Sequence, residues 1–207
     1  MHQSRLHVLA TLVVAATTLT VAGCAAAAIP GDAPAGDGTT ISTGAPDDAS
    51  SGGTADVGGT AVSGADGYVS DSTAIDRLRG RPAVSRLDPD LRRAVERATE
   101  AAAADDVEVR ITSGWRSTRY QRALLEEGIR DHGSRAEALR WVSTPERSSH
   151  VTGRAVDVGE WDAMAWMQEH GRAYGLCQVY ENEAWHYELR TSPGGTCPEL
   201  LRDSSEG

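Results

Sequence analysis

Two short stretches in the C-terminal half of the chain combine histidine with carboxylates. In SSHVTGRAVDVG, His150 precedes Asp157 by seven positions, and in ENEAWHYEL, Glu183 precedes His186 by three. A catalytic zinc ion takes three protein ligands from His, Asp or Glu and leaves one position for water. His150, Asp157 and His186 could supply these ligands, with Glu183 as a general base beside the metal. Because histidines and carboxylates often lie close by chance, the spacing leaves a zinc site and a buried polar network equally open.

The residues around Asp157 fit a strand that would present this carboxylate to a metal. The segment GRAVDVG, residues 153–159, predicts a strand in which Ala155 and Asp157 share one face. Ala155 is small and leaves room beside the metal, and Gly153 permits the backbone to turn between His150 and the strand. The strand and the turn before it would therefore carry one ligand each.

The other expected elements mix helices and strands without a repeating βαβ unit. Asp88 as cap and Pro89 in the first turn predict one helix, and Ser117 predicts the cap of a second helix that Gly133 ends. Two more helices are expected over 135–142 and 161–175, and strands over 107–114, 153–159, 176–180 and 184–190. This order favours an α+β fold, with a central antiparallel sheet flanked by helices, over a doubly wound sheet.

Composition and charge limit the class of protein. The chain has 207 residues and a net charge of -10, with 30 Asp and Glu against 20 Lys and Arg. This acidic balance argues against a nucleic-acid partner, since phosphate binding needs a basic face. Phe is absent, and every Trp and Tyr lies after residue 67, so the first third cannot supply much of a core.

The N-terminus has the layout of a secretory signal. Its apolar run, LHVLATLVVAATTLTVAGC, is too short and too rich in Ala and Thr for a membrane span. The ending VAGC resembles the lipobox of bacterial lipoproteins, which implies cleavage before Cys24 and lipid attachment to its thiol. The alternative is an ordinary signal peptide with a chance cysteine. We expect a signal peptide over 1–23 and an extracytoplasmic protein that is lipid-anchored to the cell membrane.

The segment 24–67 predicts a flexible tether, followed by one folded domain over 68–207. The tether consists mainly of Gly, Ala, Ser, Thr, Asp and Pro, which cannot bury enough apolar surface to offset their ordering entropy. With Cys24 assigned to lipid, Cys177 and Cys197 remain, and outside the cytosol we expect them to form a disulfide. Such a crosslink stabilises by about 3 kcal/mol. Two unpaired thiols are the alternative.

Three sequence elements, in order, resemble one family. SSHVTGRAVDVG fits the pattern S-x-H-x-x-G-x-A-x-D, EAWH fits E-x-W-H, and SGWRS at 113–117 resembles an upstream S-G-Y-R-S element. Together they resemble the D-alanyl-D-alanine carboxypeptidase and dipeptidase family of zinc peptidases, over roughly 107–190. Trp115 replaces the usual Tyr, and Ala184 stands where Pro is common. Neither departure removes a ligand or a catalytic group.

The resemblance implies a zinc-dependent D,D-carboxypeptidase that removes the terminal D-Ala of peptidoglycan stem peptides. One zinc ion would be held by His150, Asp157 and His186, with Glu183 as the catalytic base. Arg116 lies on the upstream element, and its guanidinium fork suits a carboxylate or a developing oxyanion.

Three further residues are candidates for substrate binding: Ser148, Trp115 and Gln121. Ser148 could hydrogen-bond the substrate terminus, although a turn-forming serine is nearly as good an interpretation. Trp115 and Trp185 could line the pocket, with core packing as the alternative. Gln121 falls where the family often has glutamine.

Other functions stay open at this point. A non-catalytic, zinc-containing cell-wall-binding module would need neither a base nor an oxyanion donor, so Glu183 and Arg116 favour the enzyme. A dipeptidase would act on free D-Ala-D-Ala, a cytoplasmic metabolite that an exported enzyme would not meet. An L,D-endopeptidase would need a groove open on both sides of the zinc, and sequence does not show groove shape. We expect a monomer.

Overall fold

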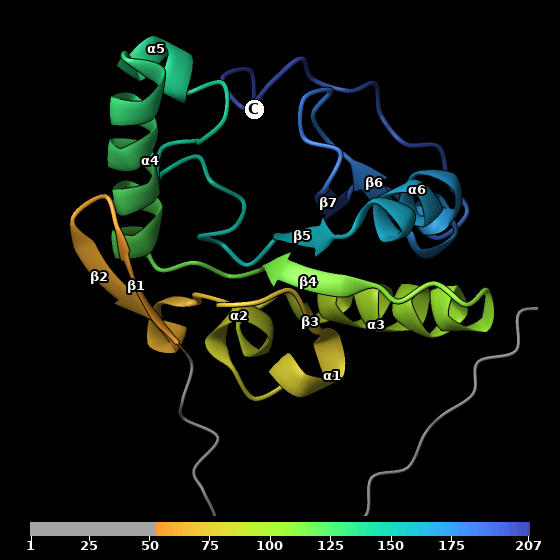
Figure 1. Cartoon of the computed structure of the whole chain (residues 1–207). Helices are drawn as coiled ribbons and strands as arrows, with labels where there is room; N and C mark the ends of the chain where they lie inside the picture. The colour runs from red at the N-terminus through yellow and green to blue at the C-terminus, as the bar shows by residue number, and fades with distance from the viewer. Residues whose placement is uncertain (1–52) are drawn as a thin grey trace, which may run out of the picture. The chain divides into compact units, whose positions relative to one another are not determined.

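The computed structural model describes residues 53–207, so the expected signal peptide, Cys24 and most of the expected tether lie outside the described residues. Its centre is a five-stranded sheet with strand order β3-β4-β5-β7-β6 (Figure 1). Every neighbouring pair in this sheet is antiparallel. The strands are β3 (Thr73–Ala74), β4 (Arg110–Ser113), β5 (Ala155–Gly159), β6 (Leu176–Gln178) and β7 (His186–Leu189). The predicted α+β fold with a central antiparallel sheet is confirmed.

Helices flank this sheet, and two of them begin at the predicted caps, Asp88 and Ser117. The helices are α1 (Ile75–Leu78), α2 (Pro82–Ser85), α3 (Pro89–Ala104), α4 (Thr118–His132), α5 (Arg135–Ala138) and α6 (Trp161–His170), with short 3-10 segments at Gly64–Asp66 and Gly171–Tyr174. The Asp88 carboxylate accepts hydrogen bonds from two backbone N–H groups in the first turn of α3. The Ser117 hydroxyl caps α4 in the same way. Along 53–207, no helix is both long enough and apolar enough to cross a membrane.

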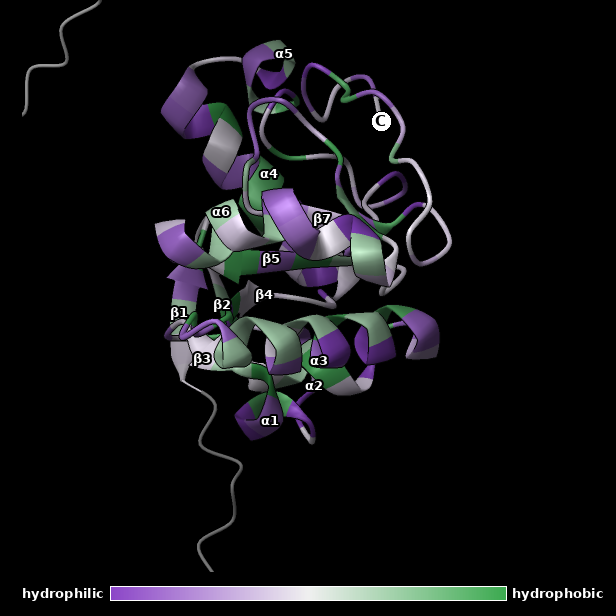
Figure 2. Cartoon of the chain, turned by 90° about the vertical axis from the view of Figure 1, so that its right-hand side faces the viewer, coloured by the Kyte–Doolittle hydropathy of each residue, from purple (hydrophilic) through white to green (hydrophobic). Residues whose placement is uncertain are grey.

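The main core lies on one face of the sheet and leaves the other face for polar side chains. Val156 and Val158 of β5 and Tyr187 of β7 are almost fully buried against apolar residues of α3 and α6. Helices α3 and α6 contact each other as well as the sheet, and in Figure 2 hydrophobic (green) segments appear on α3 and β5. Because side chains alternate along a strand, Ala155 and Asp157 face the opposite side, as predicted.

The folded part begins earlier than the sequence predicted. Strands β1 (Thr54–Val57) and β2 (Thr60–Ser63) form a hairpin in a segment that we expected to belong to the tether. The prediction was wrong for this segment because its few aliphatic side chains need no core of their own. Val57 and Val62 are instead buried against Tyr120 of α4.

The C-terminal part of the chain is covalently joined to the sheet. Cys177 of β6 and Cys197 form the expected disulfide, with an S–S distance of 2.01 Å. Beyond it, Leu201 forms an isolated β-bridge with Tyr180. The last residues therefore pack onto the domain close to the polar face of the sheet.

Candidate metal centre

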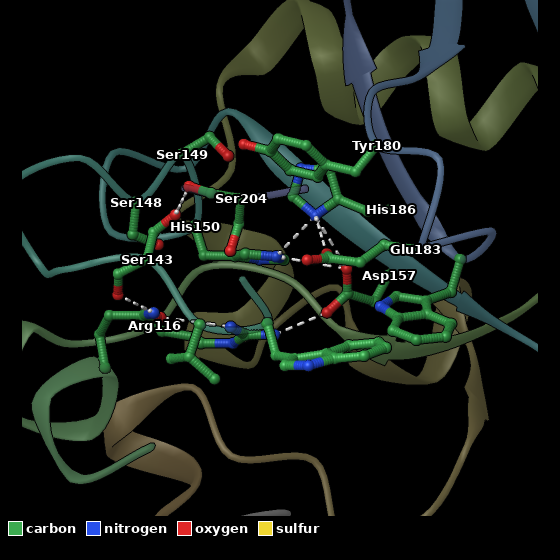
Figure 3. Close-up of a pocket in the computed structure, with 14 residues that line it drawn as sticks. Arg116, Ser143, Ser148, Ser149, His150, Asp157, Tyr180, Glu183, His186 and Ser204 are labelled. Atoms are coloured by element: carbon green, nitrogen blue, oxygen red, sulfur yellow. Dashed lines mark hydrogen bonds and ion pairs between the residues drawn. The ribbon is translucent and has the colours of Figure 1, made fainter. Parts of the chain in front are cut away.

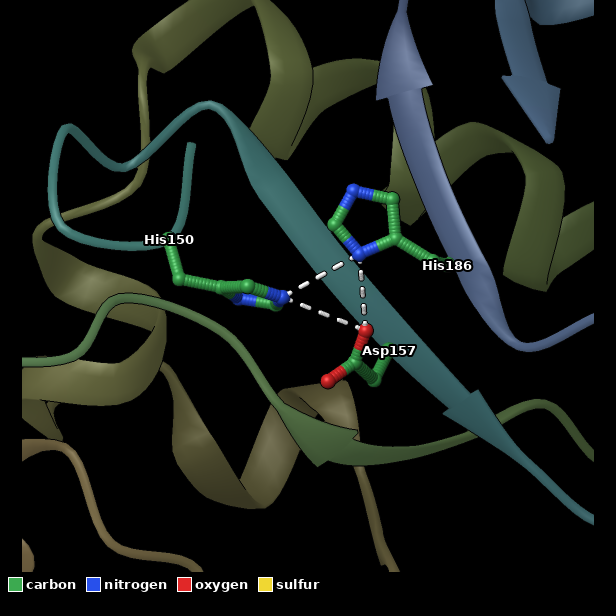
Figure 4. A group of neighbouring side chains, drawn as sticks. All are labelled: His150, Asp157 and His186. Carbon is green, nitrogen blue, oxygen red and sulfur yellow. Dashed lines mark hydrogen bonds and ion pairs between the residues drawn. The ribbon is translucent and has the colours of Figure 1, made fainter. Parts of the chain in front are cut away.

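The polar face of the sheet brings three potential metal ligands together. Asp157 of β5 lies directly opposite His186 of β7 in the strand register, and His150 comes from the turn before β5. Gly153 makes that turn possible, because its φ is 71° and a Cβ there would lie 2.3 Å from the carbonyl oxygen of Arg86. One atom from each of the three side chains lies within 4.8 Å of the others (Figure 4).

The ligand atoms face one another at short range. Nε2 of His150 lies 3.3 Å from Oδ1 of Asp157, and Nδ1 of His186 lies 3.2 Å from the same oxygen. The two ring nitrogens are 3.2 Å apart. All three side chains are buried, so bulk water does not separate these polar atoms.

The hydrogen bond of the outer nitrogen of each imidazole determines which tautomer the ring adopts, and therefore what its inner nitrogen presents to the centre. Nδ1 of His150 lies 2.7 Å from the carbonyl oxygen of Gly114, and Nε2 of His186 lies 3.2 Å from Oε1 of Glu188. Each outer nitrogen therefore donates its hydrogen outward, and a neutral ring directs a lone pair at the centre. Oδ1 of Asp157 is buried and faces the inner nitrogen of each ring. When both rings are neutral, three lone pairs converge on one point, and two histidines with one carboxylate suit zinc.

The charges of the site fit the same interpretation. Burial, together with Arg116, lowers the pKa of His150 and keeps this ring neutral. Burial alone would raise the pKa of Asp157, but His150 and Arg116 hold it well below its usual value. For His186, burial is outweighed by the hydrogen bonds to Asp157 and Glu188, which raise its pKa to about 9. A metal at this centre would compete with a proton on His186 and release it on binding.

Glu183 lies beside the ligand cluster without belonging to it (Figure 3). Its Oε2 is 3.7 Å from Nδ1 of His186, and its buried Oε1 has no hydrogen-bond partner. Burial raises the pKa of Glu183 to about 7. A carboxylate that titrates near neutrality can both accept a proton and return it, as a general base must.

Arg116 connects the metal ligands to the rest of the pocket. Its Nη2 donates to Oδ2 of Asp157 at 2.6 Å, its Nε donates to the Ser113 hydroxyl, and its Nη1 donates to Oε1 of Gln121. Asp157 thus uses Oδ2 for Arg116, and its Oδ1 faces the two imidazoles. Gln121 also donates from its amide to the backbone oxygen of Ser143. Both ends of Gln121 thus form hydrogen bonds within the protein, and its amide oxygen helps to position Arg116, while its expected role in substrate binding stays a prediction.

A small pocket of about 70 Å³ opens at the ligand cluster. It is lined by Arg116, Gln121, Trp141, Val142, Ser143, Ser148, Ser149, His150, Asp157, Tyr180, Glu183, Trp185, His186 and Ser204. Ser148 and Trp185 therefore lie where the sequence placed them. Trp115 does not line this pocket, contrary to the prediction, because its ring packs under the Arg86 guanidinium at 4.3 Å.

Several pocket residues had no sequence signal. Trp141 and Ser143 come from the loop after α5, and Ser204 comes from the C-terminal segment. Tyr180 precedes β7, and its ring centroid lies 5.1 Å from that of His186. Glu188 could have been found from the strand alternation, which places it on the same face as His186.

The comparisons agree with the sequence motifs. Residues 84–192, just over half of the chain, match the VanY family of D-alanyl-D-alanine carboxypeptidases. The chain belongs to this family. A D-alanyl-D-alanine carboxypeptidase of Enterococcus faecalis is 28% identical over 113 residues, which cover 42% of this chain and 42% of that protein. The chain thus matches less than half the length of this curated VanY relative.

Two solved structures of VanY proteins are also similar. A vancomycin-resistance D,D-pentapeptidase VanY in complex with Zn(II) is 25% identical, with a TM-score of 0.47 over 49% of this chain and 71% of that one. VanYB in complex with D-alanine-D-alanine is 26% identical, with the same TM-score over 49% of this chain and 70% of that one. The VanY match ends at residue 192, so Ser204 lies outside it.

Proposed function

We propose that this VanY-family protein is a zinc-dependent D,D-carboxypeptidase that removes the terminal D-Ala from peptidoglycan stem peptides. The observation that carries the proposal is the buried meeting of three ligand atoms beside Glu183, a carboxylate with a pKa of about 7. A structural zinc site requires no proton acceptor next to it. Glu183 therefore favours an enzyme over a non-catalytic zinc-binding module.

The residues divide the work between metal binding and proton transfer. His150, Asp157 and His186 would hold one zinc ion through Nε2, Oδ1 and Nδ1. When bound, zinc supplies a Lewis acid that activates water and polarises a carbonyl group. The Glu183 carboxylate would accept a proton from the attacking water and deliver it to the nitrogen of the leaving D-Ala.

Arg116 would contribute positive charge at a fixed place. Three hydrogen bonds orient its guanidinium, and Arg116 lines the pocket beside Ser148. A preorganised cation stabilises a terminal carboxylate or the oxyanion that develops on the scissile carbonyl. In the same pocket Ser148 would hydrogen-bond the substrate terminus.

The substrate assignment draws on the family and on the N-terminus. A curated relative is a D-alanyl-D-alanine carboxypeptidase, and VanYB is a structural relative in complex with D-alanine-D-alanine. We also propose that Cys24 carries lipid and that the following segment tethers the domain to the outer face of the cell membrane. Stem pentapeptides of new peptidoglycan would be within reach of a domain held there.

Mass spectrometry of digests tests the proposed reaction. The zinc-loaded protein is offered a stem pentapeptide ending in D-Ala-D-Ala, its analogue ending in L-Ala, and the free dipeptide. We expect release of D-Ala from the first substrate alone. Cleavage of an internal bond with the terminus intact would indicate an endopeptidase. Hydrolysis of the dipeptide alone would indicate a dipeptidase.

A further inference from the structure

We propose that the C-terminal strap, residues 197–207, closes one end of the pocket and thereby restricts the enzyme to the free ends of peptide chains. This inference rests on the proposed function and deepens it, because it separates a carboxypeptidase from an endopeptidase. The strap follows residue 192, where the VanY match ends, so the motifs that define the family do not include it.

One end of the strap is attached to the wall of the pocket that carries Tyr180. The disulfide between Cys197 and Cys177 fixes its start to β6. Leu201 then pairs with this wall through two backbone hydrogen bonds, from its own N–H to the carbonyl oxygen of Val179 at 2.9 Å and to its carbonyl oxygen from the N–H of Glu181 at 2.8 Å.

Two residues farther on, the strap is attached to the opposite wall, formed by the loop after α5. Asp203 accepts from Nε of Arg140 at 3.0 Å, and the Ser204 hydroxyl donates to the backbone oxygen of Leu139 at 2.8 Å. The Ser143 hydroxyl donates to the backbone oxygen of Ser204 at 3.3 Å. Asp203 and Ser204 are each only 4% exposed, whereas the side chain of Arg140 is about half exposed.

The strap therefore runs from one wall of the pocket to the other. Figure 1 shows it crossing from the β6 side of the domain to the loop beside α5. Ser204 lines the pocket itself, together with Tyr180 from one wall and Ser143 from the other (Figure 3). A substrate that continued through this end would have to displace a segment held by a disulfide, an ion pair and several hydrogen bonds.

This arrangement has a direct consequence for bond selection. An endopeptidase substrate extends on both sides of the scissile bond, whereas a carboxypeptidase substrate stops one residue after it. A pocket bridged at one end accepts only the second kind. Ser148, which lines the same pocket, and the nearby Arg116 suit the terminal carboxylate of the leaving residue.

A pair of peptides with the same scissile bond tests the proposal. One ends in D-Ala-D-Ala, and the other carries two further residues after the same bond. We expect the zinc-loaded full chain to prefer the free-ended peptide strongly. Deletion of residues 201–207 should reduce this preference by about tenfold or more, through faster cleavage of the extended peptide, with the zinc content unchanged.

Two substitutions control for general damage. Asp203→Ala breaks the attachment to Arg140 without shortening the chain and should shift the preference in the same direction. Arg202→Ala is the matched control, because this neighbouring side chain is solvent-exposed and, within residues 53–207, forms an ion pair with Glu206 alone. It should leave the preference unchanged.

Three outcomes separate the two proposals. If the full chain cleaves both peptides equally well, or if a folded, zinc-loaded deletion variant and Asp203→Ala both keep the original preference, the strap does not select chain ends. If the full chain releases no D-Ala from the free-ended peptide, the proposed substrate is wrong. The same pair of peptides built on a tetrapeptide with a terminal L,D bond then tests the strap by itself, and no preference there would also refute it.

Discussion

Replacing Glu183 with glutamine separates proton transfer from metal binding. The amide keeps the size of the side chain but cannot accept a proton at neutral pH. Glu183 is not one of the three converging ligands, so Glu183→Gln should bind one equivalent of zinc as the wild type does. Its turnover should nevertheless fall, because the attacking water loses its base.

The expected fall in turnover follows from the role of Glu183 as a general base. General base catalysis contributes about 10²- to 10⁴-fold, which corresponds to about 3 to 5 kcal/mol in the activation free energy. Burial raises the pKa of Glu183 to about 7, so in the wild type kcat/KM should decline as the pH falls below that value and the carboxylate becomes protonated. This acidic limb should disappear in the variant.

In the metal-free protein, the same substitution should increase the free energy of unfolding at alkaline pH, although it lowers turnover in the zinc-loaded enzyme. A carboxyl group whose folded pKa is raised stabilises the fold less as the pH rises from its ordinary value of 4.5 towards 7. Above pH 7 the charged, buried carboxylate costs on the order of 3 kcal/mol, which Glu183→Gln removes. Urea unfolding of both proteins after chelation should therefore find the variant more stable at pH 8 and the difference smaller at pH 5.

Steady-state kinetics, metal analysis and urea unfolding together test whether Glu183 acts as the base and not as a metal ligand. Near-normal turnover of zinc-loaded Glu183→Gln would refute the assignment of the base. Loss of zinc from the variant would show instead that Glu183 helps to hold the metal. Asn182→Ala is a suitable neighbouring control for turnover, since its side chain bonds the backbone oxygen of Arg140 outside the ligand cluster.

Three other outcomes are expected. Glu188→Gln should weaken zinc binding by about 10- to 100-fold in a chelator competition, because Glu188 accepts the outer hydrogen of His186; unchanged affinity would contradict this role. Removal of the disulfide by Cys177→Ser with Cys197→Ser should lower the free energy of unfolding by about 3 kcal/mol in urea, and an unchanged midpoint would argue against it. Burial would raise the pKa of Asp66, but hydrogen bonds to its carboxylate lower it. The wild type should therefore be more stable than Asp66→Asn at pH 7, and the difference should shrink as the pH falls below the ordinary value of 3.8. A difference that grows in acid would contradict the lowered pKa.

The sequence predicted the features that depend on local chemistry. Helix caps at Asp88 and Ser117 act within a few residues, and the alternation that sets Asp157 apart from Val156 is a property of any strand. The three candidate metal ligands could also be identified from the sequence, because the motifs that carry them are short and contiguous. What joined these motifs into one site was the register of β5 and β7, which the sequence did not supply.

The features that sequence reasoning missed depend on packing between distant segments. The hairpin of β1 and β2 has few apolar residues, so its composition alone indicated a tether. It is held because Val57 and Val62 pack against α4. Trp115 lies in one of the motifs, yet its ring packs against the guanidinium of Arg86, about thirty residues earlier in the chain. Ser204 reached the pocket only because the strap folds back over it.

The disulfide links the completion of the pocket to the redox state of its surroundings. The ligand cluster draws on β5, β7 and the turn before β5, none of which contains a cysteine, so metal uptake has no requirement for oxidation. The strap, in contrast, is fastened at Cys197, and in a reducing compartment only its noncovalent contacts would hold it. Reduction of this disulfide would therefore loosen the strap and leave the three converging side chains of the ligand cluster in place.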